Sequence, residues 1–514
     1  MIDTKALREK ILDLAMRGKL VPQDPNDEPA SELLKRIKAE KEELIKQKKI
    51  KRDKSETEIF RGDDNLHYEK FADGTVKVID VPYELPKEWE WAKLVSLSAT
   101  VSVPMADGPF GSNLKSSHYT SDKEVRIIQL SNIGEDGQWK EANTKYTTFE
   151  HLKTIQRSEV KSGDLVIAKM MPAGKAIITP NSEKAYVLSS DAVKLVPNKS
   201  INSDLLLKFI NSNTFREQVY VEVQGITRAR TSLSKLKNYL VPIPPIEEQE
   251  KILVVLDKYY ELISLVDNEQ QSIQKLATQL KQKVLDVAMH GKLVPQDPND
   301  EPASVLLEKI RAEKQRLFEE GKLKKKDLVE TEIVKGDDNA YYENLPKNWL
   351  IQSISSVGDI RTGNTPSKSH SEYYNGEFPF FKPTDLSQGI DLRYSSETLT
   401  SLGFVKSRHL PKGSVLVNSI GNIGTVALLS VDGAFNQQIN GIYPYSFVDS
   451  RFLFWLLGTT IVQEQMIEKA SATTIAIINK TKFNSIQIAF PSILLQRTIA
   501  DTIGKIVLVL NSLL

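Results

Sequence analysis

This sequence of 514 residues contains no cysteine. A disulfide framework, a thiolate zinc site, an iron–sulfur cluster and a cysteine nucleophile are therefore excluded. The six histidines are scattered, and no HExxH pair indicates zinc bound through histidine. No apolar run reaches the ~18 residues that a membrane span needs, and the N-terminal residues lack the apolar core of a signal peptide. These absences predict a soluble, intracellular protein without a metal site of these kinds.

An excess of charge of one sign is also missing, since 68 basic side chains face 67 acidic ones and the net charge is +1. Over the whole chain this balance argues against a nucleic-acid binder. The charge is unevenly distributed, however: segment 86–245 carries a net +5, segment 346–491 a net +2, and the remainder a net −6. The balance therefore conceals two mildly basic segments on an acidic frame.

The chain repeats itself. Residues 10–31 read KILDLAMRGKLVPQDPNDEPAS and residues 283–304 read KVLDVAMHGKLVPQDPNDEPAS, with 19 of 22 positions identical at an offset of 273. Both copies continue through a charged, helix-like stretch, a lysine-rich run, the tetrapeptides E-T-E-I and G-D-D-N, and finally L-P-K-x-W at 85–89 and 345–349. An internal repeat of this kind indicates a duplicated structural unit.

A second alignment, at an offset of 247, relates 244–252 to 491–499. Apolar residues follow both copies at the 4-3-4-3 spacing of a coiled-coil seam. Residues 246–290 would form one helix of ~68 Å, and the two termini together would supply a second helix, cut in two. The pattern predicts two long antiparallel helices, pseudo-twofold symmetry and a circularly permuted repeat.

The repeated loop that follows each helix is rich in Pro, Asp and Asn. It either packs within the chain or forms a docking surface for a partner that is present twice. We favour docking, because two identical partners would keep two polar loops alike. The candidate docking residues are Gln23, Asp24, Asn26, Asp27, Gln296, Asp297, Asn299 and Asp300.

The two segments between the repeats barely resemble each other in sequence, and both read as mixed α/β. We expect short strands at 126–130, 164–168, 186–188, 415–417 and 425–429, and a helix near the end of each segment, at 203–219 and 449–469. The fold class is therefore α+β. Its expected divisions are 1–85 (first repeat), 86–245 (first module), 246–345 (central helix and second repeat), 346–491 (second module) and 492–514 (C-terminal helix).

Polar loops in both modules carry groups that contact nucleic acids. Arginine and lysine suit guanine, whereas asparagine and glutamine suit adenine. Each of these side chains is otherwise an ordinary exposed loop residue. The DNA-binding candidates are Ser112, Asn113, Lys115, Ser116, Gln129, Asn132, Lys169, Arg228, Arg230, Arg361, Thr362, Asn364, Lys368, Lys382, Asn436, Gln437 and Gln438.

With its duplicated AM[RH]GKLVPQDPNDEPAS blocks, its L-P-K-x-W motifs, its DGPFGSNLKSSHY stretch (107–119) and its P-P-x-x-E-Q-x-x-I motif (244–252), the chain resembles the specificity subunit of type I restriction–modification systems. The second copy of the last motif departs from the pattern, because Leu495 replaces the glutamate; we interpret this as drift that leaves the fold intact.

The resemblance implies that each module is a target recognition domain that reads one half of a bipartite DNA site, and that the helices set the gap. It implies docking of two methyltransferase subunits, which use S-adenosylmethionine to methylate adenine N6. Two motor–nuclease subunits, which use ATP and Mg²⁺, would join for restriction, and this chain itself would bind no cofactor.

The lack of recognisable catalytic motifs agrees with a non-catalytic role. The one candidate Pro-Pro, at 244–245, lacks the amide and the aromatic ring with which an adenine methyltransferase grips a flipped base. No GxxxxGK[ST] phosphate loop occurs. The alternative from another class is a non-catalytic coiled-coil scaffold that binds two proteins through its modules.

Overall fold

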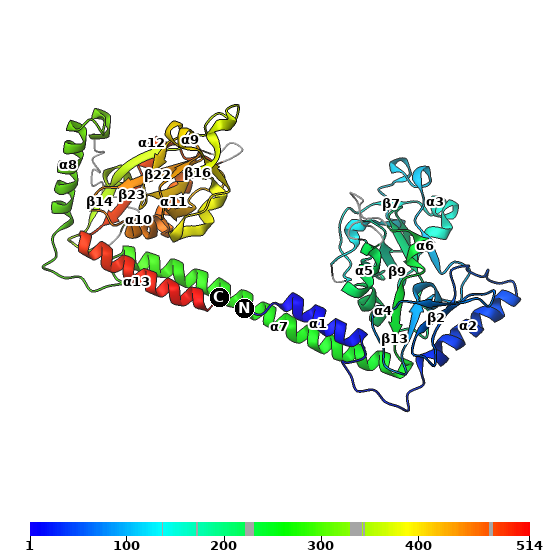
Figure 1. Cartoon of the computed structure of the whole chain (residues 1–514). Coiled ribbons are helices and arrows are strands. Elements are labelled where there is room, and N and C mark those ends of the chain that lie inside the picture. The colour runs from blue at the N-terminus through cyan, green and yellow to red at the C-terminus, as the bar shows by residue number, and fades with distance from the viewer. Residues whose placement is uncertain are drawn as a thin grey trace. The chain divides into compact units, whose positions relative to one another are not determined.

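The computed structural model describes residues 1–135, 137–170, 173–221, 231–328, 342, 345–471 and 476–513. The chain divides into two compact units, Met1–Glu269 and Gln270–Leu514. The division falls inside α7 (Ile246–Met289), a single helix of 44 residues, so each unit contains about half of that helix (Figure 1).

In the first unit, α1 (Thr4–Met16) runs antiparallel to the first part of α7. The Thr4 hydroxyl donates to the Asp267 carboxylate, and Arg8 Nη2 donates to Ser264 Oγ at 2.7 Å, so residue numbers rise along one helix as they fall along the other. The antiparallel pairing predicted from the apolar spacing is confirmed here.

In the second unit, α13 (Ile493–Ser512) lies along the remaining part of α7 and runs in the opposite direction (Figure 1). Leu285 and Met289 of α7 belong to the same buried cluster as Ile499 and Ile503 of α13. The predicted seam is therefore only partly confirmed. Ile252, Leu256 and Ile263 are buried, whereas Tyr259, Ile273 and Leu280, which were also assigned to it, are 42%, 44% and 50% exposed. Toward the end of α7, Leu285 and Met289 are buried and the assigned Val284 and Val287 are only half-buried.

The repeated loops fold alike because the same glycine ends the preceding helix in both units. Gly18 and Gly291 adopt φ angles of +63° and +70°, the left-handed conformation that caps many helices. A Cβ atom at these positions would lie 2.4 Å from Pro86 Cγ and 2.5 Å from Pro346 Cγ. The prolines belong to the two L-P-K-x-W motifs, which explains why loop and motif repeat together.

The helices that follow, α2 (Ala30–Lys46) and α8 (Ala303–Glu319), begin directly after a proline. The amide of Ala30 donates to the carbonyl oxygen of Glu88 at 2.8 Å, and that of Ala303 to Asn348 at 3.1 Å. Each helix is thus held at its start by the L-P-K-x-W motif.

The first unit adds a three-stranded antiparallel sheet that the sequence patterns did not predict: β1 (Glu58–Arg61), β2 (His67–Lys70) and β3 (Val76–Ile79). The second copies of E-T-E-I and G-D-D-N, at 330–333 and 336–339, lie outside the described residues.

Each module is joined to its frame by a two-stranded antiparallel sheet. In the first unit β4 (Glu90–Lys93) pairs with β13 (Leu240–Ile243), and in the second β14 (Leu350–Ser353) pairs with β23 (Gln487–Phe490). The chain therefore enters and leaves each module side by side, directly after L-P-K-x-W and before the long helix.

Two four-stranded sheets make up the first module. Their strand orders are β10-β9-β12-β5 and β7-β6-β11-β8. The strands are β5 (Met105–Asp107), β6 (Val125–Ile128), β7 (Tyr146–Thr147), β8 (Glu159–Val160), β9 (Leu165–Ala168), β10 (Ala176–Ile178), β11 (Tyr186–Leu188) and β12 (Ala192–Leu195).

The second module has the same topology despite its unlike sequence. Its strand orders are β15-β22-β19-β20 and β17-β16-β21-β18. Each strand from β5 to β12 of the first module therefore has a counterpart, in the same sequence order, among β15 to β22 of the second. One pair in each module is parallel, β6 with β11 and β16 with β21. The strands are β15 (Gly358–Thr362), β16 (Tyr374–Phe381), β17 (Glu397–Leu399), β18 (His409–Leu410), β19 (Val415–Asn418), β20 (Val426–Leu428), β21 (Gly433–Phe435) and β22 (Ile439–Pro444).

The helices correspond as well. The first module contains α3 (Phe149–Thr154), α4 (Ser203–Ile210), α5 (Asn213–Val221) and α6 (Leu233–Leu236), and the second contains α9 (Ser401–Lys406), α10 (Ser450–Leu457), α11 (Thr460–Lys469) and α12 (Lys480–Asn484). The five strands expected in the modules are present within two residues at each end.

The single helices expected at 203–219 and 449–469 are wrong in one respect, because each is broken into two. At the first break Ser212 Oγ accepts a hydrogen bond from the amide of Phe215 at 3.2 Å and starts a new helix. At the second, Asp286 of α7 accepts from the amide of Thr460 at 3.0 Å. Side chains that bind the backbone override helical propensity at both points.

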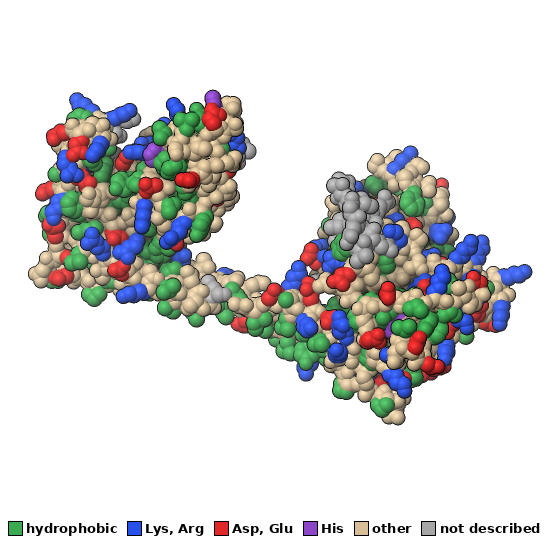
Figure 2. Space-filling view, viewed as in Figure 1, with side chains coloured by type: hydrophobic (Ala, Val, Ile, Leu, Met, Phe, Trp, Pro, Cys, Tyr) green, Lys and Arg blue, Asp and Glu red, His purple; other side chains and the backbone are tan. Residues whose placement is uncertain are grey.

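None of the described helices is long and apolar enough to cross a membrane. On the visible face of each unit, basic and acidic side chains are interspersed (Figure 2).

Candidate nucleic-acid interface

The parallel strand pair of each module ends at an edge where polar residues follow both strands. In the first module Gln129 follows β6 and Ser189 follows β11, and the Ser189 amide donates to the carbonyl oxygen of Ile128 at 2.9 Å. Lys382 and Asn436 occupy the same positions after β16 and β21. We call this region the loop edge of each module: Gln129, Ser131, Asn143 and Ser189–Asp191 in the first, and Thr362, Asn364, Lys382, Arg408 and Asn436–Gln438 in the second.

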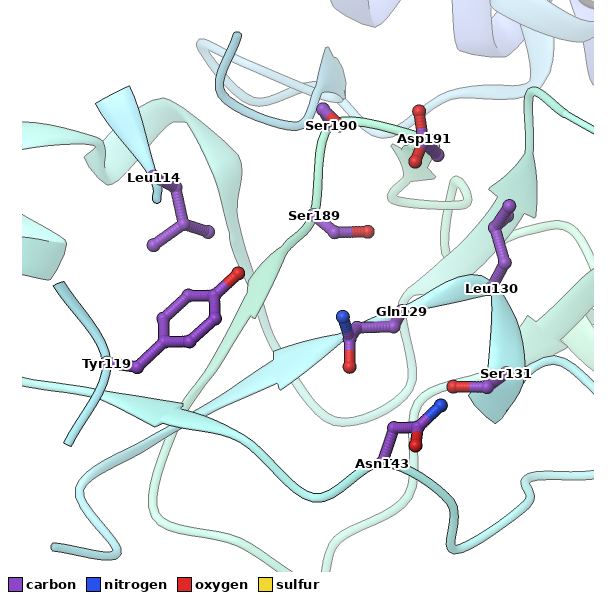
Figure 3. A pocket seen from close by; sticks show the side chains of 9 residues that line it. All are labelled: Leu114, Tyr119, Gln129, Leu130, Ser131, Asn143, Ser189, Ser190 and Asp191. Atoms are coloured by element: carbon purple, nitrogen blue, oxygen red, sulfur yellow. The ribbon is translucent and has the colours of Figure 1, made fainter. Parts of the chain in front are cut away.

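A pocket of about 370 Å³ opens at the loop edge of the first module. In Figure 3, Gln129 lies at the centre of the lining side chains, between Tyr119 and Ser131. The Oε1 atom of Gln129 and the Oγ atom of Ser131 are buried and lack a hydrogen-bond partner within the described part of the chain. Buried polar atoms normally have a partner, so this pocket is prepared for a polar ligand.

Asn132 was predicted to bind DNA, but the structure uses its whole side chain internally. It is 0% exposed, accepts a hydrogen bond from the Gln129 amide at 2.9 Å, and donates to the carbonyl oxygens of Lys140 (2.9 Å) and Ala142 (2.8 Å). Asn132 therefore shapes the turn that presents Gln129. Asp385 does the same for Lys382 in the second module, by accepting from its amide at 2.7 Å.

The loop at 108–116 begins at the same edge. A Cβ atom on Gly108 would lie 1.7 Å from the carbonyl oxygen of Ser189, so only glycine allows this approach. The predicted residues of this loop are all exposed: Ser112, Asn113, Lys115 and Ser116.

Lys169 differs from those loop residues, because it is 2% exposed. Its Nζ atom pairs with Asp107 Oδ1 at 2.6 Å and lies 4.9 Å from the centre of the exposed Phe110 ring. The charge of Lys169 is therefore paired within the protein, and besides Asp107 its ammonium group lies close to the Phe110 ring. Arg228 and Arg230 lie outside the described residues.

In the second module, the structure brings the predicted Asn364, Lys382 and Asn436 to one edge, because the Asn364 amide donates to the carbonyl oxygen of Phe435 at 3.1 Å and the Asn436 amide to that of Phe381 at 3.1 Å. Thr362 Oγ1 donates to Asn440 Oδ1 at 2.6 Å, and Asn364 Oδ1 accepts from the amide of Arg408 at 2.5 Å. Gln437 Oε1 accepts from Thr365 Oγ1 at 2.6 Å.

The remaining candidates of the second module have different surroundings. The Asn436 side chain is bonded to both the side chain and the backbone amide of Gln438. Lys382 pairs with Glu397, and Arg361 pairs with Asp359 at 2.8 Å. Lys368 is exposed on the loop that follows the edge.

Several loop-edge residues were missed by the sequence reasoning. Arg408 is exposed and donates through Nη1 to the carbonyl oxygen of Thr362 at 2.7 Å, but an isolated arginine before a two-residue strand gives no sequence signal. The run Ser189–Asp191 does give one, since it directly follows a buried strand, as Asn436–Gln438 does in the other module.

The predicted docking residues divide into two groups. Asp27 pairs with Lys251 at 3.1 Å, and Asp300 accepts from Ser492 Oγ at 3.1 Å, so both serve the fold. Gln23 and Gln296 likewise donate to the carbonyl oxygens of the helix-ending glycines. The other four are exposed and lie in turns closed by an aspartate side chain: Asp24, Asn26, Asp297 and Asn299. Gln23 is exposed as well.

These contacts correct one premise of the docking argument. Most of the repeated polar residues, including the turn-closing Asp24 and Asp297, have intramolecular roles, so folding alone accounts for part of the identity between the loops. The exposed turn residues are the ones that a partner would have to preserve.

The structure also explains the departure at Leu495. Glu248, at the equivalent position of α7, accepts from Trp89 Nε1 at 2.9 Å and from Gln23 Nε2 at 2.6 Å. In the second unit Gln296 Oε1 accepts directly from Trp349 Nε1 at 3.0 Å, which leaves an apolar position for leucine. The change is therefore compensated within the unit.

Among the described residues, no group of three or more His, Asp or Glu side chains could hold a metal ion.

Comparisons with known proteins agree with this architecture. The sequence model of the type I restriction modification DNA specificity domain matches residues 119–275 and 346–512. The EcoAI specificity subunit of Escherichia coli is 32% identical over 418 residues, which cover 70% of this chain and 63% of that protein. The EcoEI specificity subunit of the same species is 30% identical over 482 residues, which cover 81% of this chain and 73% of that protein.

A solved structure shows the same fold. A chain from a study of complex assembly and conformational transition of the type I R-M system aligns with a TM-score of 0.55 at 17% identity, over 84% of this chain and 93% of that chain. The alignment with the EcoAI subunit spans less than two thirds of that relative's length. With two matches to the domain model over most of its length, the chain belongs to the family of type I restriction–modification specificity subunits.

Proposed function

We propose that this chain selects the DNA target of a type I restriction–modification complex. The first module, 86–245, reads one half of a bipartite site, the second module, 346–491, reads the other half, and α7 sets the gap between them. The observation that carries the proposal is that two modules of unlike sequence share one strand order and one polar loop edge.

A shared scaffold with different edge residues suits a protein that presents two readers to one duplex. The strands position the edges equally, whereas the side chains on them differ, so the two half-sites differ in sequence. Loop side chains on base edges supply specificity, while phosphate contacts supply position and affinity. The net charges of +5 and +2 on the modules favour such phosphate contacts, and binding should weaken steeply as salt rises.

The family assigns this chain recognition, not catalysis. We propose that two methyltransferase subunits, with S-adenosylmethionine, dock on the repeats, and that two motor–nuclease subunits, with ATP and Mg²⁺, join for restriction in the cytoplasm. Exposed apolar side chains along α7 support a protein partner, because contiguous apolar surface is usually covered. They are Val254, Leu262, Leu265, Ile273, Leu276 and Leu280.

Exchange of residues 346–491 for the corresponding module of another family member tests the DNA proposal. Mapping of N6-methyladenine in cells that express the chain with its methyltransferase should show one altered half-site and one unchanged half-site. Alteration of both halves would contradict modular reading.

The docking proposal is tested on the exposed turn residues. Alanine at Asp24, Asn26, Asp297 and Asn299 together should reduce the fraction of chain that co-elutes with the methyltransferase in gel filtration. The matched control is Lys35→Ala, which removes an exposed side chain of α2 outside the loop. Normal assembly of the fourfold variant would remove these loops from the docking surface.

A further inference from the structure

The two loop edges differ in hydrogen-bonding character, not only in sequence. We propose that the first edge reads an adenine through Gln129, with Asp191 as a second acceptor, and that the second edge reads a guanine through Arg408. This inference rests on the proposed DNA-recognition function and names the bases on which that function depends.

The first edge contains two free acceptors. Gln129 Oε1 is buried without a partner, and the Asp191 carboxylate, which lines the same pocket, makes no hydrogen bond or ion pair with the described residues (Figure 3). A buried acceptor is unfavourable until a donor reaches it. In the major groove the donors are the amino groups of adenine and cytosine, and a glutamine amide matches adenine N6 and N7 together.

The free groups of the second edge are donors. The Arg408 guanidinium is exposed, and of its nitrogen atoms only Nη1 has a hydrogen bond within the described residues, to the carbonyl oxygen of Thr362. Because the Gln437 carbonyl oxygen already accepts from Thr365, the NH₂ group of Gln437 remains to donate. An arginine fork matches O6 and N7 of guanine.

The difference arises at equivalent positions. Ser158 Oγ donates to the carbonyl oxygen of Asp107 at 2.9 Å, as Arg408 does to that of Thr362 at 2.7 Å. One module thus has a buried serine where the other has an exposed guanidinium.

The same holds on the neighbouring strand. The carbonyl oxygen of Asp191 accepts from the amide of Lys169, which follows β9, and that of Gln438 accepts from the amide of Ser419, which follows β19, both at 2.8 Å. Asp191 and Gln438 are therefore equivalent, and the carboxylate of one module corresponds to the side-chain amide of the other. Lys169 and Lys382 do not change this difference between an acceptor-bearing first edge and a donor-bearing second edge, because each forms an ion pair within the protein, Lys169 with Asp107 and Lys382 with Glu397.

The experiment uses the full chain co-purified with its methyltransferase and a randomised duplex library, with bound DNA sequenced. For the wild type we expect an A·T pair that depends on Gln129 in one half-site and a G·C pair that depends on Arg408 in the other. Gln129→Leu and Asp191→Asn should lower the preference for the A·T pair by about fivefold or more, and Arg408→Ala should do the same for the G·C pair. Each variant should leave the other half-site unchanged.

Two further arms make the result specific. Asp122→Asn removes an exposed carboxylate at the far end of β6 and should change neither preference. A duplex in which purine, which lacks the N6 amino group, replaces the adenine should bind the wild type at least about fivefold more weakly and should cause no further loss with Gln129→Leu.

The outcomes are distinguishable. If the pair that responds to Gln129 is G·C, or if folded Gln129 and Asp191 variants keep the wild-type preference, the inference is overturned and DNA recognition stands. If the wild-type complex enriches no sequence, the proposed function fails, and the inference fails with it. Gln129→Glu retains the acceptors, so it should still favour an amino-bearing base even if the leucine variant misfolds.

Discussion

Glu248 and Leu495 occupy equivalent positions near the start of α7 and α13, but only Glu248 can accept a hydrogen bond from the nearby tryptophan. A buried tryptophan indole needs an acceptor in both units. In the first unit the Glu248 carboxylate accepts from Trp89 and Gln23, and burial raises the pKa of Glu248. In the second unit Gln296 accepts from Trp349 without help. The loop glutamine therefore compensates for the change from glutamate to leucine.

This compensation predicts the effect of copying one unit into the other. Glu248→Leu should lower the free energy of unfolding by less than about 1 kcal/mol, because Gln23 can then accept from Trp89 as Gln296 does from Trp349. Glu248→Leu with Gln23→Leu should lower it by about 1–3 kcal/mol, because the buried indole loses both acceptors. Urea unfolding measures both variants. Equal losses would show that Gln23 does not take over.

Glu90 gives a pH-dependent prediction. Burial raises the pKa of this carboxyl to about 7, above its usual value. The unfavourable buried charge is fully present above pH 7 and absent below the pKa of the unfolded chain. Glu90→Gln should therefore stabilise the protein by about 1–2 kcal/mol at pH 8, after allowance for solvent screening, and by much less at pH 5. The neighbouring Glu88→Gln is the control for urea unfolding at both pH values, and equal stabilisation by Glu90→Gln at pH 5 and pH 8 would contradict the stated cause.

At the scale of elements, the turn after each long helix links the repeat to the module. Gly18 and Gly291 end their helices in the left-handed conformation and contact the proline of L-P-K-x-W. Helix end, loop and module attachment therefore form one packed element in each unit.

Glycine substitutions should change stability in opposite directions according to this packing. Gly18→Ala should lower the free energy of unfolding by about 2–4 kcal/mol, because a side chain strains the backbone and meets Pro86. Gly504→Ala in α13 should raise it by about 0.5–1 kcal/mol, since no atom lies within 4 Å of its Cβ and alanine favours helix. Thermal unfolding of both variants tests this. Destabilisation by Gly504→Ala would indicate a contact that the structure does not show.

At the scale of the whole molecule, α7 is a continuous helix that contributes to both units. Its 44 residues are close to the 45 expected from the apolar spacing. A helix has a fixed rise per residue, so its length can serve as a measure of distance along DNA.

Insertion of seven residues after Gln270, with a matching insertion in the split helix, should lengthen α7 by ~10 Å. The gap between the methylated half-sites should then grow by ~3 base pairs, at 3.4 Å per pair, or binding should be lost. An unchanged gap with full activity would contradict the measuring role of the helix. Methylation mapping in cells gives the readout.

The fold was largely predictable where the sequence repeats or alternates. The long helices, the glycine-capped turns and the strands near 126–130 and 415–417 follow from local patterns. The break at Thr460 was not predictable, because the distant Asp286 side chain decides it, whereas the break at Ser212 depends on a local contact between Ser212 and the amide of Phe215 that the sequence reasoning missed. The candidate site was only partly predictable: Gln129 and Asn436–Gln438 lie at loop edges, whereas Asn132 is buried and Arg408 had no sequence signal.

By itself, the sequence determined the duplicated frame, the two-module organisation and the family resemblance, because repeats, apolar periodicity and glycine or proline positions are local properties of the chain. Only the tertiary structure decided that the two modules share one topology, since strand pairing joins residues far apart in sequence. It also decided which polar groups are free, because a side chain such as Asn132 is available or occupied according to the backbone packed around it.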